Sequence, residues 1–229
     1  MNYILFDDVQ IRQQLLPFTF TRPVADIRLG IDTIREKWER YLGQAVSVLT
    51  EDYLSGKYPL HRERQNVLIN ASVLPDAELV ATIKALQMNQ VLSFEDTMIA
   101  HGIESPAAAG AGATEEIEYM RPFRSIENNW DLFLLNGGQI CLDFVALTRG
   151  RHSAPISVSN RVIAPENIFV EEGATVEMAM LNASEGPIYI GKDAEIMEGA
   201  MLRGPLVVGH HSVVKIGAQM AGRATMRPH

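Results

Sequence analysis

The chain has 229 residues, of which 47% are apolar, and a formal net charge of −8 at pH 7. This length allows one large domain or two smaller ones, and the apolar share is too high for a disordered chain. The negative charge argues against a nucleic-acid-binding protein, because no basic stripe is present to neutralise phosphates. It does not exclude one small phosphorylated ligand.

The sequence predicts a cytoplasmic protein. Its one cysteine, Cys141, cannot form a disulfide within the chain, which fits a reducing compartment. The alternation around Cys141 is typical of a strand, so we expect a buried structural thiol. The first residues lack the basic and apolar regions of a signal peptide, and no stretch approaches the roughly 20 apolar residues of a membrane helix. We therefore expect no membrane partner.

The first half of the chain alternates strand-like and helix-like segments. Residues 3–6 form a short apolar run that Asp7 and Asp8 close, as in a buried strand. Apolar residues at helical spacing follow, with Gly43 as a stop; they are Ile31, Ile34, Trp38 and Tyr41. Residues 45–49 and 67–69 resemble further buried strands. A second helical stripe at 79–86 begins after Pro75-Asp76. This alternation predicts a mainly parallel sheet with crossover helices.

Two segments separate this half from the next. Residues 105–114 are rich in proline, alanine and glycine and predict a loop. A helix is expected around Trp130, Phe133 and Leu134, ended by the Asn-Gly-Gly at 136–138, and it is our candidate connector. Asn128 and Asn129 precede it and are interpreted as a helix N-cap rather than as ligands.

After Ser157 a period of six replaces the helical spacing. Six apolar residues follow one another at this interval: Ile190, Ile196, Leu202, Val208, Val214 and Met220. Small residues stand two places before four of them: Ala194, Ala200, Ser212 and Ala218. An earlier register through Ala164, Val170 and Val176 is offset by two residues, so Gly186-Pro187 marks an insertion.

A period of six predicts a parallel β-helix of hexapeptide repeats. Each flat face of such a helix is a short strand with one side chain on the axis, and neighbouring coils stack these side chains into columns. The small residues fit where the chain bends close to the interior. An antiparallel sandwich would show period two and longer strands, and is disfavoured.

Three stretches resemble one family of enzymes. Residues 16–23, Leu-Pro-Phe-Thr-Phe-Thr-Arg-Pro, are similar to the R-P-L-T-x-T-R-P-K segment of sugar-1-phosphate nucleotidyltransferases. Residues 66–74 are similar to the strand of these enzymes that ends in N-G-D, and residues 188–208 to a β-helix opening. Together they resemble the bifunctional N-acetylglucosamine-1-phosphate uridylyltransferase/glucosamine-1-phosphate acetyltransferases, in a divergent short bacterial branch.

The resemblance implies a fold and an activity. It implies an α/β nucleotidyltransferase-like (Rossmann-like) domain at 1–125, a connector helix and linker at 126–157, and a left-handed parallel β-helix at 158–229. It implies a nucleotidyltransferase and acyltransferase that forms UDP-N-acetylglucosamine for the cell envelope, using Mg²⁺ and acetyl-CoA in the intact protein. It further implies a nucleotide-sugar or sugar-phosphate ligand and a homotrimer packed through the β-helices.

The sequence departs from the family at the points that the chemistry uses. No glycine occurs between Met1 and Leu29, where the family has a phosphate-binding loop. Val24 stands at the position of the family's lysine, and Ser72 at that of its metal-binding aspartate. Too few residues follow Ser72 for the usual sugar-binding subdomain.

The remaining candidates for a site are arginines and carboxylates near the first strand. Arg12, Arg22 and Arg28, with Thr21, are candidates for phosphate binding, because arginine forks suit phosphate oxygens. Arg22 and Arg28 flank the loop that would face a ligand at the carboxyl edge of the sheet. Asp7 and Asp8 are candidates for a metal. The alternative for each is a solvated or salt-bridged surface residue.

The acetyltransferase half lacks its catalytic part. In the family the catalytic histidine and the acetyl-CoA contacts lie in later coils, so we expect the chain to be a fragment of a longer protein. His210 and His211 follow Gly209 at a coil turn and are expected to be solvated. His152 lies in the linker and has no assigned role.

Two hypotheses remain. The first is a transferase fragment of sugar-nucleotide biosynthesis. The second is a catalytically degenerate protein that binds a nucleotide sugar or serves as a trimeric scaffold, which the missing glycine loop, the missing lysine and Ser72 favour. A β-helix enzyme of another kind, such as a metal-dependent hydratase or another acyltransferase, would need clustered histidines that the chain does not supply.

Overall fold

The computed structural model describes residues 1–104 and 115–226, which form two compact units. The first unit comprises Met1–Arg28 and Asp32–Asn129, and the second comprises Leu29–Ile31 and the residues from Trp130 onward. The predicted loop at 105–114 lies outside the described residues.

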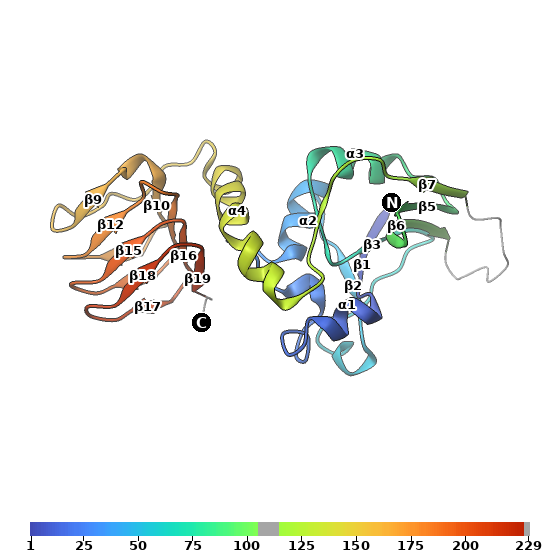
Figure 1. Ribbon diagram of the computed structural model, residues 1–229, viewed down its shortest axis with the longest axis horizontal. Coiled ribbons are helices and arrows are strands. Elements are labelled where there is room, and N and C mark those ends of the chain that lie inside the picture. The colour runs from blue at the N-terminus through green and yellow to red at the C-terminus, as the bar shows by residue number, and fades with distance from the viewer. Residues whose placement is uncertain (105–114, 227–229) are drawn as a thin grey trace. The chain divides into compact units, whose positions relative to one another are not determined.

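The first unit is built on a six-stranded sheet with the order β2-β1-β3-β6-β5-β7 (Figure 1). Its strands are β1 (Asn2–Phe6), β2 (Ser47–Leu49), β3 (Gln65–Asn70), β5 (Gln90–Phe94), β6 (Thr97–Glu104) and β7 (Glu115–Glu118). β1 pairs in parallel with β2 and β3, as the apolar runs predict, and is buried on both faces. β6 pairs antiparallel with both β3 and β5, whereas β5 pairs in parallel with β7, so β6 alone runs against the other strands of this sheet and the expectation of a mainly parallel sheet is confirmed.

Helices of the first unit begin and end where the sequence supplies caps. α2 (Ile34–Leu42) starts with a capping box between Thr33 and Glu36 and ends at Gly43, which has φ +76°. α3 (Ala77–Ala85) begins after Asp76, whose carboxylate accepts from two backbone N–H groups. The remaining short elements are α1 (Val9–Gln14), η1 (Val24–Asp26), η2 (Asp52–Leu54), β4 (Val73–Leu74) and β8 (Arg124–Ser125). α2 contacts α3 and β4, and the buried indole of Trp38 donates to the Val73 carbonyl.

The second unit stacks short strands into three parallel sheets, and we call residues 161–226 the parallel-strand stack. The sheets have the orders β10-β13-β16-β19, β11-β14-β17 and β18-β15-β12-β9, so successive strands visit each sheet in turn (Figure 1). The strands are β9 (Arg161–Ile163), β10 (Ile168–Val170), β11 (Thr175–Val176), β12 (Met180–Asn182), β13 (Ile188–Ile190), β14 (Glu195–Ile196), β15 (Met201–Arg203), β16 (Leu206–Val208), β17 (Val213–Val214), β18 (Gln219–Ala221) and β19 (Ala224–Met226). The 3₁₀ turn η3 is Pro165–Asn167. This arrangement is compatible with a β-helix.

The register of the stack explains the sequence period. Ile188 pairs with Leu206 and Met201 with Gln219, each 18 positions later, which corresponds to three hexapeptides per coil. In the preceding coil Ile168 pairs with Ile188, 20 positions later, because the connection from Met180 to Ile188, which includes Gly186, is three residues longer than the one from Met201 to Leu206, while the step from Thr175 to Met180 is one residue shorter than that from Glu195 to Met201. The apolar column predicted from the sequence lies on β13 to β18 and packs in one core, in which Met220 is only half-buried.

α4 (Asn129–Thr148) corrects two predictions from the sequence. We expected the helix to end at 136–138 and Cys141 to be buried in a strand. The helix instead continues to Thr148, and Cys141 lies on it, exposed. The reason is tertiary: Asn136 accepts from Gly30 N–H (2.7 Å) and donates to the Arg223 carbonyl (2.7 Å), so this residue is fixed in the helix rather than at its end.

α4 also corrects the expectation that no stretch approaches a membrane helix, because it is the one described helix that is long and apolar enough to cross a membrane, by length and composition alone. Many core helices of soluble proteins pass the same test. One side of α4 packs on the stack, where buried Ile140 contacts Val207, and Phe144 and Leu147 pack beside them. The carboxylate of buried Asp143 accepts from Ile31 N–H (2.9 Å). This side of α4 is therefore bound inside the second unit.

Gly30 allows the Leu29–Ile31 segment to lie against α4. Its φ is +85°, and a Cβ there would come within 2.4 Å of the Asp143 carboxylate and 2.9 Å of the Gln139 backbone. We predict that Gly30→Ala lowers the free energy of unfolding of the second unit by about 3 kcal/mol, since it adds a clash to the cost of a left-handed backbone. Gly150→Ala is the control, because Gly150 has φ +72° with nothing near its Cβ position, and should cost about 1 kcal/mol. Equal losses in urea unfolding of the two variants would contradict this account.

A polar cluster on the stack predicts a pH dependence. Arg151 donates to Glu171 (2.6 Å), as does the Tyr189 hydroxyl, whose ring stacks on Phe169. Burial opposes ionisation of Glu171, but these two hydrogen bonds outweigh it and hold the pKa of Glu171 below its ordinary value, while burial raises the pKa of Tyr189. A lowered carboxyl pKa contributes stability above the ordinary pKa, and this is lost as pH falls through the lowered value.

We therefore predict that Glu171→Gln costs under about 1 kcal/mol near pH 7, because Arg151 is half exposed and its charge is screened. The difference from wild type should shrink as pH falls through the acidic range, measured by thermal unfolding at several pH values. Glu172→Gln, at the exposed neighbouring position, is the control and should not show this convergence.

Candidate functional site

The candidate site lies in the first unit, where β1, β2 and β3 end. Asp7 and Asp8 follow β1, Thr50 and Glu51 follow β2, and Ala71 follows β3. Parallel neighbours end at the same edge of a sheet, and ligands bind at this edge in many α/β folds. The loop at residues 16–26 belongs to the same edge, because backbone N–H of Val24 donates to Asp7 (2.9 Å).

Asp7 and Arg12 form a buried ion pair at this edge. The Arg12 Nη1 lies 2.8 Å from Asp7 Oδ2, and the two side chains are 7% and 3% exposed. Asp7 also accepts from the Thr50 hydroxyl (2.6 Å). Burial raises the pKa of Asp7, and the hydrogen bonds from Thr50 and Val24 and the Arg12 charge offset part of that rise.

Arg12 connects this pair to the loop that follows. Its guanidinium donates to the carbonyls of Thr19 (2.6 Å) and Arg22 (3.3 Å) and to the Tyr53 hydroxyl (2.7 Å). The Thr19 hydroxyl donates back to the Arg12 carbonyl (2.8 Å). Arg12 is thus buried among groups of the chain itself, an arrangement that favours positioning of the loop over direct phosphate binding.

The two aspartates have different roles. Asp8 is the N-cap of α1, where its carboxylate accepts from the N–H groups of Gln10 (2.9 Å) and Ile11 (3.0 Å). Asp7 is bound to Arg12, Thr50 and Val24. Within residues 1–104 and 115–226, no group of three or more histidine, cysteine or acidic side chains could hold a metal ion. The side chains present at this edge therefore do not fit a metal centre, and we derive no chemical step through one.

Arg22 differs from the other two arginines. It is half-buried, and its Nε is buried with no hydrogen-bond partner within the described parts of the chain. Arg28 instead lies 3.6 Å from Glu36, within the capping box of α2. Neighbouring Thr21 is exposed. An unpartnered guanidinium nitrogen in a loop at this edge can bind an anion such as phosphate.

Ser72 and Asn70 occupy the end of β3, where the resembling enzymes have the N-G-D sequence. Both are buried, and Asn70 Oδ1 accepts from the backbone N–H (3.0 Å) and the hydroxyl (2.9 Å) of Ser72. The Ser72 carbonyl accepts from Ile126 N–H (2.9 Å). These residues form a closed turn, and the serine hydroxyl offers no anionic ligand.

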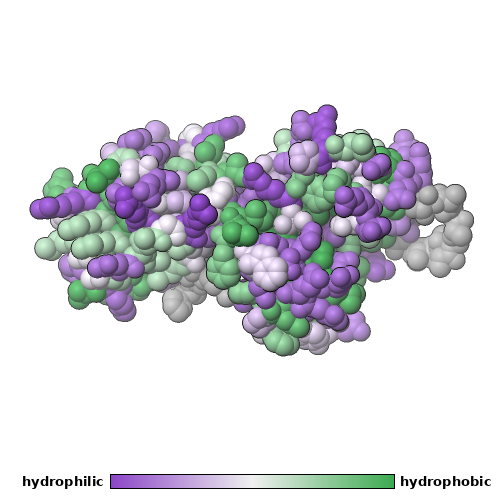
Figure 2. All heavy atoms as spheres, viewed as in Figure 1, coloured by the Kyte–Doolittle hydropathy of each residue, from purple (hydrophilic) through white to green (hydrophobic). Residues whose placement is uncertain are grey.

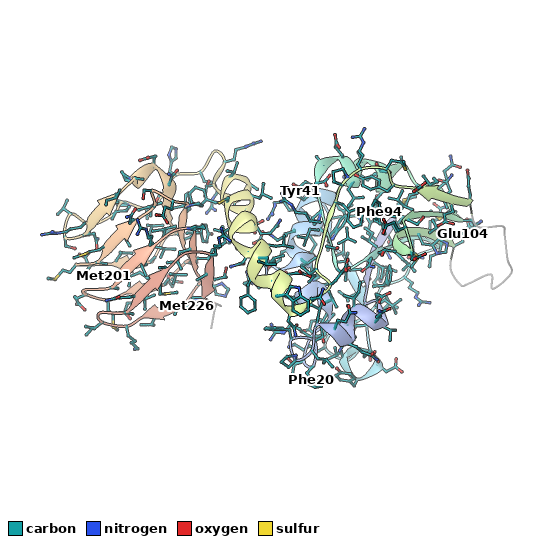
Figure 3. The ribbon with its side chains drawn as sticks, viewed as in Figure 1. Phe20, Tyr41, Phe94, Glu104, Met201 and Met226 are labelled. Carbon is teal, nitrogen blue, oxygen red and sulfur yellow. The ribbon has the colours of Figure 1, made fainter. Side chains whose placement is uncertain are left out.

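Asn129 lies at the start of α4 and contacts the same loop. Its amide nitrogen donates to the Leu16 carbonyl (2.7 Å), while its Oδ1 is buried and has no partner among the residues described. The loop then extends to Phe20, whose ring is 59% exposed near its tip (Figure 3). A shallow hollow of about 160 Å³ lies beside it, between Gln13 and Tyr53.

Sequence reasoning missed Thr19, Thr50 and Tyr53 as partners of Asp7 and Arg12. One signal was available: Thr50 directly follows β2 as Asp7 follows β1, and the ends of neighbouring parallel strands lie together. Thr19 and Tyr53 have no such signal, because loop geometry sets their contacts. The histidines expected to be solvated, His210 and His211, are both exposed in the second unit.

We predict that Asp7→Asn lowers the free energy of unfolding of the first unit by about 3 kcal/mol, because the buried Arg12 charge loses its nearer counter-ion and keeps only the more exposed Glu51, 3.8 Å away. Asp8→Asn is the matched control and should change stability by less than about 0.5 kcal/mol, since asparagine caps helices as well as aspartate does. Urea unfolding monitored by the fluorescence of buried Trp38 would measure both. If the two variants unfold alike, Asp7 has no structural role beyond that of its neighbour.

Comparison with known proteins agrees with this architecture. A family described as sugar nucleotidyl transferase matches residues 3–152, which is more than half of the chain. A search of curated proteins found no matching relative. The match includes the sheet, the loop at 16–26 and α4. On this evidence, the chain belongs to the sugar nucleotidyl transferase family.

Proposed function

We propose that the first unit binds a nucleotide sugar or a sugar phosphate at the carboxyl edge of its sheet, with Arg22 as the phosphate-binding residue. The observation that supports this most is the buried, unpartnered Nε of Arg22 in a chain of the sugar nucleotidyl transferase family. The Asp7–Arg12 pair holds the backbone on both sides of Arg22, so its side chain is presented from a fixed loop. Preorganised donors lower the cost of binding an anion.

The finer form of the proposal is formation of UDP-N-acetylglucosamine. A phosphate oxygen of N-acetylglucosamine 1-phosphate would attack the α-phosphorus of UTP, with pyrophosphate as the leaving group. Mg²⁺ would enter with the nucleotide phosphates rather than in a protein cage, as is common for this ion. Acetyl transfer from acetyl-CoA is the second activity of the proposal, for the intact family protein.

A catalytically degenerate binding protein is the second candidate, and the end of β3 favours it. The Ser72 hydroxyl is turned to Asn70, in place of a carboxylate that could hold Mg²⁺. No glycine occurs between Met1 and Leu29 to bring backbone N–H groups to the phosphates. Under this candidate the ligand is bound and not converted.

The proposal for the second unit is a left-handed β-helix that assembles a homotrimer. The face formed by β9, β12, β15 and β18 is a shallow apolar hollow of about 790 Å³ whose lining includes Met180 and Met201. Met201 lies on the outer side of β15 (Figure 3). A broad exposed apolar face on a parallel sheet is typical of an interface between subunits. The cytoplasm remains the expected location, because Cys141 can form no disulfide within the chain.

Calorimetric titration of the full chain tests the site. UDP-N-acetylglucosamine and UTP, each with and without Mg²⁺, are expected to bind, and Arg22→Ala should weaken binding at least about tenfold, because one charge-assisted contact is lost. Arg22→Lys should recover part of the loss. Arg64→Ala is the control, because Arg64 is exposed and precedes β3 at the opposite edge of the sheet, and it should bind as wild type does.

Release of pyrophosphate from UTP and a sugar phosphate separates the two candidates. Turnover that Arg22→Ala reduces supports the transferase, whereas binding without turnover supports the degenerate protein. Failure of every ligand to bind, with the chain folded, would overturn both.

A further inference from the structure

The side of α4 that faces away from the stack is a continuous apolar surface. Its large side chains are 55–69% exposed: Trp130, Phe133, Leu134, Leu142 and Val145. All exposed residues of α4 from 130 to 146 are apolar residues or glycine. We call this surface the α4 stripe. Soluble proteins rarely leave such a surface in water, so it marks a contact.

The position of the helix in the second unit is fixed by its other side. Asn136 and Asp143 bond to the Leu29–Ile31 segment, and Ile140 is buried against the stack. α4 therefore cannot rotate to bury the stripe in its own unit without breaking these contacts. In the view of Figure 2, hydrophobic residues gather on the surface over α4.

We propose that the α4 stripe binds the α4 stripe of a second copy of this chain. The exposed residues of the stripe carry no charge, so contact through it brings no like charges together, although each copy carries a formal net charge of −8. A membrane-surface helix would instead place lysine and arginine beside its apolar side, and α4 contains neither between Asn129 and Thr148.

The spacing of the stripe fits helix-to-helix packing. Leu134, Gly138, Cys141 and Val145 follow one another at intervals of four, three and four, the spacing of a coiled-coil seam. Gly138 and Cys141 are small and lie at the centre, which lets two helix backbones approach closely while Leu142 and Phe133 fill the sides. The five large side chains expose on the order of 600 Å², against about 800 Å² per partner in a stable interface.

The first test is the mass of the full chain in solution, measured by light scattering after size exclusion across a range of concentrations. Wild type should be an oligomer at micromolar concentration, and Leu142→Glu should raise its dissociation constant at least about tenfold, because a charge would be buried without a partner. Ile216→Glu is the control, since Ile216 is a 72% exposed apolar residue of the same unit and lies outside the stripe. Far-UV circular dichroism of Leu142→Glu checks that the variant is folded.

The stack is proposed above to form a homotrimer through a separate face, so Met201→Glu distinguishes the two interfaces. Three outcomes overturn the α4 proposal: a monomeric wild type, a Leu142→Glu chain that associates as wild type does, or dissociation caused by Met201→Glu and not by Leu142→Glu, which would leave the stack as the interface. A covalent test uses the one cysteine. Cys141 lies in the stripe, so a short bismaleimide should link two copies, and Cys141→Ser should abolish the link. An oligomer that the reagent does not link would also count against an α4 interface.

Tryptophan fluorescence gives a further readout. When dilution dissociates the oligomer, the emission of Trp130 should shift to the red, whereas buried Trp38 should not contribute to the shift.

Discussion

The candidate site of the first unit depends on the buried ion pair between Asp7 and Arg12. Asp7 fixes the start of η1 through Val24, and Arg12 fixes the loop through the Thr19 and Arg22 carbonyls. In nucleotidyltransferases with a glycine-rich loop, backbone N–H groups form the phosphate site. Here the residues after β1 include no glycine before Gly30, and the Asp7–Arg12 side chains order this edge of the sheet. An ion pair with this little exposure is stable only when its remaining donors and acceptors are bonded, as these are.

Most of the other candidate residues are bonded to groups of the chain itself. Asn70 and Ser72 close a turn on each other, where a carboxylate could have held a metal. Arg28 joins the cap of α2, and Asp8 caps α1. Among the candidate residues predicted from the sequence, Arg22 is the one that combines a place in the loop with a buried nitrogen lacking a partner in the described structure. Family membership supports a sugar-nucleotide transferase role and implies a nucleotide-sugar or sugar-phosphate ligand.

α4 links the architecture of the second unit to its surface. One side is held by Asn136, Asp143 and Ile140, and the other consists of apolar residues in water. The same helix thus explains why two sequence predictions were wrong, and its apolar side carries the proposed contact with a second copy. Asn136, Gly137 and Gly138 favour a helix end by propensity, but contacts with Gly30 and Arg223 keep Asn136 helical.

The sequence by itself determined the elements whose signals are local or periodic. The helix stop at Gly43, the helix start after Asp76 and the strand of residues 3–6 follow from local preferences of the backbone and of its own side chains, whereas the cap at Thr33 was not predicted. The period of six and the two-residue offset near Gly186 appear directly in the register of the stack. Tertiary structure decided three things: the antiparallel pairing of β6, the continuation of α4, and the partners of Arg12. Each of these depends on groups far apart in the chain, such as Arg12 and Tyr53. No local sequence pattern indicates which distant group will accept a donor's hydrogen bonds.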